Sequence, residues 1–177
     1  MKALLQGGVL VLFGLLSGAV SAVVNQPPDG YEFEEPTPWK ETGKTLPPYP
    51  NDDDLLPVDI DTVRSTFNYF IDSKNLAVSE DGVVTYTVII TSDSGAKNVL
   101  HEGIRCGIRK YKTYAYGGSD GKLQEVKEAA WRKIDRVGPT AFRNDFYNYY
   151  LCDELDRSLS PRQIIERVKH PQTVTKP

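Results

Sequence analysis

Hydrophobic and polar residues alternate along much of the chain after Thr66, and this two-residue period predicts β-strands. The clearest strand covers residues 83–91, where β-branched and aromatic residues predominate. Shorter strands are predicted at 67–71, 74–78, 97–106, 109–116 and 123–126. Most of these strands follow one another through short turns rich in Gly, Ser and Asp, which predicts an antiparallel meander.

The period changes to that of a helix after residue 138. Four aromatic residues share one helical face: Phe142, Phe146, Tyr149 and Tyr150. We interpret this stripe as core packing against the sheet rather than as a ligand cleft. A second helix is predicted to start after Ser160, with Pro161 at its first position and Gln163 completing a capping box. The expected fold class is α+β: an antiparallel β-meander packed by two helices and preceded by an extended, Pro-rich acidic arm.

The N-terminus has the layout of an export signal. Lys2 is a basic start, residues 3–24 are mostly apolar, and Val20-Ser21-Ala22 carries the compact residues that a signal peptidase recognises. We therefore expect residues 1–22 to be a signal peptide and the mature chain to begin near Val23. The alternative is a retained membrane anchor, because the apolar run is long enough to span a bilayer. We expect a periplasmic or cell-surface protein, and with the signal cleaved its membrane association is peripheral or absent.

Charge divides the rest of the chain into an arm and a domain. Residues 25–61 hold ten acids, two bases and eight of the twelve prolines, whereas residues 62–177 hold fourteen acids and eighteen bases. We expect residues 23–61 to form an extended arm, residues 62–170 a single α+β domain and residues 171–177 a flexible tail. Aromatic residues are interleaved in the arm. We therefore expect the arm to lie along the domain, with its negative charge against a positive face.

Three roles compete for Cys106. A nucleophile needs a base, but His101 lies five positions away on the same predicted strand and so on its opposite face. A metal site needs three or four ligands, and the chain has only two cysteines and two histidines. A disulfide with Cys152, at the end of the aromatic helix, fits an exported protein best. Two buried free thiols and a reactive cysteine are the alternatives.

Basic and aromatic residues gather around Cys106 and predict a binding surface. A continuous strand would put Ile108 and Lys110 on the same face, so we expect a bulge near Gly107. The candidate binding residues are Glu102, Arg105, Arg109, Tyr111, Lys112 and Tyr114. The export signal and the formal net charge of −3 argue against nucleic acid. We expect the partner to be an envelope protein or an anionic envelope component, with no cofactor and no metal. The alternative is a solvated sheet face.

Several short stretches carry a family resemblance: Tyr69-Phe70-Ile71-Asp72, Asp81-Gly82-Val83-Val84, Asn98-Val99, Glu102-Gly103-Ile104-Arg105-Cys106, Tyr111-Lys112, Trp131 and Cys152. With these stretches the sequence resembles the cryptic neisserial protein-like family, exported proteins of Gram-negative bacteria, over about residues 46–168. The resemblance implies a location and an extent, and no reaction. No nucleophile elbow, phosphate loop or dinucleotide fingerprint occurs in the sequence.

Together these observations favour a non-catalytic accessory or binding module of the envelope with one structural disulfide. The alternative is an enzyme that acts on an envelope polymer, with Glu102 and Arg105 as its polar site residues.

Overall fold

A computed structural model describes residues 38–43, 45–61 and 67–171. The expected signal peptide, the first part of the arm and most of the expected tail lie outside these residues. The part of the chain that is described belongs to one compact unit, which starts at Pro38. The second half of the segment that the sequence assigns to the arm is therefore part of the folded unit.

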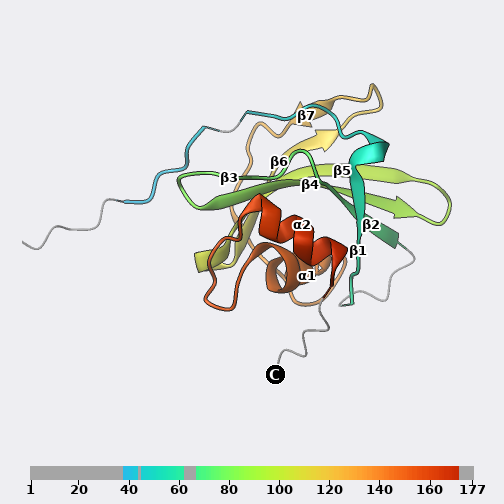
Figure 1. Cartoon of the computed structure of the whole chain (residues 1–177). Helices are drawn as coiled ribbons and strands as arrows, with labels where there is room; N and C mark the ends of the chain where they lie inside the picture. Colours follow the sequence, from blue (N-terminus) through green and yellow to red (C-terminus); the bar gives the residue numbers. More distant parts are fainter. Residues whose placement is uncertain (1–37, 44, 62–66, 172–177) are drawn as a thin grey trace, which may run out of the picture. The chain divides into compact units, whose positions relative to one another are not determined.

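An antiparallel eight-stranded sheet forms the centre of the structure, in the order β1-β2-β4-β5-β6-β7 (Figure 1). β3 also pairs with β4, and β8 also pairs with β6. The strands are β1 Leu55–Val58, β2 Phe67–Asp72, β3 Ala77–Val78, β4 Val83–Ser92, β5 Lys97–Arg105, β6 Lys110–Gly117, β7 Leu123–Glu125 and β8 Arg132–Lys133. The α+β prediction is confirmed, and the meander runs from β4 through β5 and β6 to β7.

The central strand β4 is buried on both faces. Val83 and Val84 point to opposite faces and neither is exposed to solvent. Tyr86 and Val88 belong to the core on the same face as Val84. A strand covered on both sides explains why residues 83–91 are so rich in β-branched residues. It also means that a layer of chain lies on each face of the sheet.

One layer consists of helices (Figure 1). It contains α1 Phe142–Asp145, a π-helical turn Phe146–Leu151 and α2 Pro161–Lys169. The predicted aromatic stripe packs here as expected, with Phe146 stacked on Tyr86 at a centroid distance of 5.3 Å. The predicted capping box of Ser160 and Gln163 is present. None of the helices in the described ranges is both long and apolar enough to cross a membrane.

The aromatic helix differs from the prediction in its winding. Only one turn is α-helical, after which the backbone widens and the N–H of Cys152 donates to the carbonyl of Tyr147 at 3.2 Å. A π-helical turn brings residues five apart into register instead of four. The widening buries Phe146, Tyr147, Tyr150 and Leu151 together. The four-residue spacing of the aromatic stripe gave no sign of this change.

The second layer is supplied by the arm. Thr45 and Pro47 lie near Thr85 and His101, which are on the sheet face opposite Tyr86. Farther along, the arm becomes the edge strand β1, which pairs with β2. Pro57 is compatible with this position because an edge strand leaves some N–H positions unpaired. The sheet thus starts before residue 62, within the segment that the sequence assigns to the arm.

The connection between β5 and β6 is a turn. The predicted bulge near Gly107 is wrong: Cys106–Ile108 form a 3-10 turn, and Arg109 has a left-handed backbone with φ of 52°. Arg105 pairs with Lys110, so the chain reverses direction between them. The register shift of this strand pair lies instead between His101 and Glu102.

Candidate functional site

The two cysteines form a disulfide between the sheet and the helical layer. The S–S distance is 2.00 Å and the Cα atoms of Cys106 and Cys152 are 5.7 Å apart. Both side chains are buried. Tyr147 reinforces the same junction, because its hydroxyl donates to the carbonyl of Cys106 at 3.0 Å. The predicted pairing is confirmed, and Cys106 is therefore not a free thiol nucleophile.

Glu102 lies inside the protein rather than on a binding surface. Its side chain has no exposure, and Arg143 donates to both carboxylate oxygens, at 2.8 Å and 2.6 Å. The hydroxyl of Tyr86 donates to Oε2 at 3.0 Å and that of Thr113 to Oε1 at 2.7 Å. Four donors thus satisfy this carboxylate, which is what a buried charge requires.

Arg143 is the counter-charge of this buried network. Its guanidinium lies 4.1 Å from the ring centroid of Tyr111, so Tyr111 is also part of the core rather than of a surface. Burial by itself lowers the pKa of Arg143, but the charge and hydrogen bonds of Glu102, with smaller contributions from Tyr86 and Tyr111, together outweigh burial and raise it. Burial and the same carboxylate raise the pKa of Tyr86. The group therefore stays as an ion pair with a neutral phenol.

Arg109 faces the helical layer. Its guanidinium lies 4.3 Å from the ring centroid of Tyr147 and donates to the side-chain oxygens of Asn144 and Asn148. Arg109 is thus separated from the remaining candidate residues.

Two of the other three candidates, Lys112 and Tyr114, bind a carboxylate from the arm. Glu41 accepts hydrogen bonds from Lys112 Nζ at 2.9 Å, from the Tyr114 hydroxyl at 2.7 Å and from Trp131 Nε1 at 3.2 Å. Arg105 lies close by, with its guanidinium 3.4 Å from the ring centroid of Trp39. The arm therefore covers the basic and aromatic surface, as its negative charge predicted.

We call residues 39–42 the strap and the residues that hold it the strap site: Asp81, Arg105, Lys112, Tyr114 and Trp131. Asp81 fixes both ends of the strap. Its carbonyl accepts from Trp39 Nε1 at 2.8 Å, and its carboxylate accepts from the N–H and hydroxyl of Thr42 at 2.8 Å and 2.9 Å. The indoles of Trp39 and Trp131 meet edge to face at 6.1 Å.

The ionisation of the strap site follows from these contacts. Burial opposes the charge of Glu41, but hydrogen bonds from Lys112, Tyr114 and Trp131 outweigh burial and lower its pKa. Burial, followed by the bond to Glu41, raises the pKa of Tyr114. Glu41 is therefore a carboxylate and Tyr114 a neutral donor at neutral pH.

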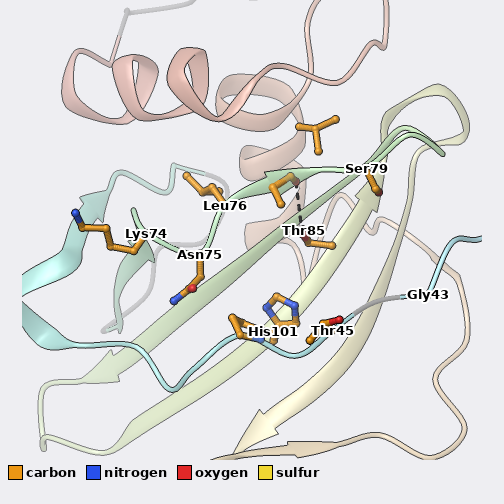
Figure 2. Close-up of a pocket in the computed structure, with 11 residues that line it drawn as sticks. Gly43, Thr45, Lys74, Asn75, Leu76, Ser79, Thr85 and His101 are labelled. Carbon is orange, nitrogen blue, oxygen red and sulfur yellow. Dashed lines mark hydrogen bonds between the residues drawn. The ribbon is translucent and has the colours of Figure 1, made fainter.

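A shallow cavity of about 310 Å³ lies beside the strap on the arm side of the sheet (Figure 2). Thr45, Lys74, Asn75, Thr85 and His101 are among its lining residues. His101 is buried and shares a 3.0 Å hydrogen bond with Thr87. Among the residues that the structure describes, no group of three or more His, Cys, Asp or Glu side chains is arranged to hold a metal ion.

Residues 34–169 match the CNP1-like family. The chain belongs to this family. The search of curated proteins and the search of solved structures each found no match. The match confirms the family resemblance and extends it in the N-terminal direction.

The strap and the strap site both lie within the region that matches the CNP1-like family. The disulfide and Arg143 lie within it as well. The sequence pointed to Arg105, Lys112 and Tyr114 but missed Arg143, Asp81 and the role of Trp39 and Glu41. A signal for Arg143 was present, because a cation one residue after Phe142 in an aromatic helix must find an acid if it is buried. Nothing local pointed to Asp81.

Proposed function

We propose that this member of the CNP1-like family is an exported, non-catalytic binding domain of the cell envelope. The observation that carries the proposal is the strap site, where cations and indoles from distant parts of the chain meet at the surface. Trp39 is 40 % exposed there. Trp and Arg, which carry these indole and guanidinium groups, are among the residue types most enriched at the centres of protein interfaces.

The disulfide supports an oxidising compartment. Disulfides persist in secreted and periplasmic proteins and are rare in the cytosol of mesophiles. Cys106 and Cys152 are buried and join two elements that pack together, which is typical of a structural bond. This agrees with the export signal expected at residues 1–22.

The enzymatic alternative depended on Glu102 and Arg105, and the geometry does not favour it. Glu102 is enclosed and engaged by four donors, whereas a general acid or base must reach the substrate. Arg105 stacks on Trp39 at the surface. The two side chains therefore do not share a site.

The partner class that we propose is an envelope protein or an anionic component of the envelope. Arg105 and Lys112 contribute positive charge to the strap site, and Trp131 contributes an N–H donor. Lys112 and Trp131 already hold one carboxylate, that of Glu41, which supports an anionic group as the ligand.

Cell fractionation combined with site-specific photo-crosslinking tests this proposal. A photoreactive residue at Arg132, beside Trp131, should give adducts in intact cells, whereas one at Leu155 should not. Both positions are exposed, and Leu155 lies in the turn after the disulfide. The protein should fractionate with the periplasm or envelope and contain no titratable thiol. A cytoplasmic protein with two reduced thiols, or equal adducts at both positions, would refute it.

A further inference from the structure

We propose that the strap site is a receptor for an acidic, aromatic-containing segment of a partner protein. In this proposal the strap, Trp39 to Thr42, occupies the place that the partner's segment would take. This inference rests on the proposed binding function and names its ligand class: an indole followed two residues later by a carboxylate.

The carboxylate pocket is built by the domain and not by the strap. Tyr114 is held under Gly103, where an added Cβ would lie 2.7 Å from the Tyr114 ring. Tyr114 and Lys112 are fixed on β6, which pairs with β5. Two of the three donors to Glu41 are therefore held in place by the sheet, and a different carboxylate would meet them there.

The indole site is equally anchored. Arg105 is the residue before Cys106, so its backbone is tied to the helical layer through the disulfide. Its guanidinium contacts the face of Trp39 and lies 5.9 Å from the centroid of Trp131. A guanidinium beside an indole face is a favourable cation–π arrangement, and any aromatic ring that enters this place gains it.

Asp81 sets the direction of the bound segment. Its carboxylate accepts from the hydroxyl of Ser79, in the turn before β4, and from the N–H of Val83, the first residue of β4. The same carboxylate accepts from the backbone N–H of Thr42, and a backbone N–H is available from nearly any residue. The strap site thus binds an aromatic ring, a carboxylate and a backbone N–H that follow one another in this order along the bound segment.

The strap is held in a way that permits exchange. Residues 38–43 belong to no helix or strand, and most of them are exposed. Glu41 and Trp39 attach through side chains rather than through a strand ladder. Because a tethered segment competes at an effective concentration in the millimolar range, an outside segment binds well only after the strap is weakened or displaced.

Fluorescence anisotropy with the full chain tests the inference. The probe is a labelled synthetic peptide with the sequence of residues 36–43. The receptor is the variant Trp39→Ala/Glu41→Gln, whose own strap no longer competes. We expect saturable binding to this variant and binding to the wild type that is at least about tenfold weaker. A peptide with Gln in place of its Glu should bind at least about tenfold more weakly, and so should a receptor that also carries Lys112→Met.

Folding of each receptor is checked by its circular dichroism and intact disulfide. If the double variant does not fold, Glu41→Gln alone, which keeps the stacked Trp39, serves as the receptor. No binding to a folded receptor, or equal binding of the Glu and Gln peptides, would overturn the inference. A wild-type dimer that Glu41→Gln abolishes would assign the site to a second copy of this chain instead. The proposed function is tested separately, by the cell fractionation and the photo-crosslinking described above.

Discussion

Glu102 on β5 and Arg143 on α1 form a two-bond ion pair in the interior, between the sheet and the helical layer. The nitrogen–oxygen distances are 2.8 Å and 2.6 Å, and the two residues are 41 positions apart in the sequence. Tyr86 and Thr113 complete the shell around the carboxylate. This pair, together with the disulfide, joins the aromatic helix to the sheet.

Removing one charge of this pair should cost far more than removing both. Glu102→Gln leaves a buried guanidinium without a counter-charge, and we expect the free energy of unfolding to fall by about 3–5 kcal/mol. Glu102→Leu/Arg143→Met replaces the pair with apolar groups and should recover most of this loss. Urea denaturation of the oxidised protein measures both.

A surface pair provides the control for that experiment. Lys97 and Asp52 are 2.5 Å apart, with side chains that are 33 % and 78 % exposed. Lys97→Met should change the free energy of unfolding by less than about 1 kcal/mol. A Glu102→Gln variant that is no less stable than Lys97→Met would contradict the buried ion pair.

The disulfide should stabilise the fold because it closes a loop and so lowers the conformational entropy of the unfolded chain. Cys106 and Cys152 are 46 residues apart, and closing a loop of that size corresponds to roughly 4 kcal/mol in the chain-entropy estimate. Cys106→Ser and Cys152→Ser should each lower the free energy of unfolding by about 2–5 kcal/mol. The double variant should be no worse than either single one. Additive losses would show that each cysteine acts independently of the bond.

Acid should weaken the fold through His101 before it affects the carboxylates. Burial lowers the pKa of His101 from 6.5 to about 4, although the nearby charges of Glu102 and Asp72 oppose this. Between these pH values the unfolded chain binds a proton that the folded chain does not, so stability falls as the pH falls from 6.5 toward 4.

Urea midpoints at several pH values between 5 and 6.5 measure this dependence. His101→Gln should remove the slope, and His170→Gln, at the exposed end of α2, should retain it. An unchanged slope in His101→Gln would assign the dependence to other groups.

Gly103 should resist substitution because it makes room for Tyr114. An added Cβ would lie 2.7 Å from the Tyr114 ring and 2.9 Å from Val83 Cγ1. We expect Gly103→Ala to cost about 1–3 kcal/mol of unfolding free energy. Gly107→Ala is the matched control, since its nearest neighbour would be 4.0 Å away. Thermal unfolding compares the two, and equal midpoints would contradict the tight contact.

Much of the fold was evident in the sequence. The six strands predicted after residue 66 all have a counterpart, although β3 covers only Ala77–Val78 of the predicted 74–78, α2 has its capping box, and the disulfide forms as expected. The strands and the helix depend on short-range patterns, namely alternation along a strand and a cap and a box three residues apart. The disulfide was predicted from the even cysteine count and the expected export. Short-range patterns are read directly from neighbouring residues.

What only the tertiary structure decided are the contacts between residues far apart. Glu102 pairs with Arg143, and Glu41 accepts a hydrogen bond from Trp131, which is 90 positions away in the sequence. No periodicity encodes such a meeting, because it depends on how the sheet, the helices and the arm stack in space. The same reason explains why Glu102 became an interior ion pair although the sequence placed it among the candidate binding residues.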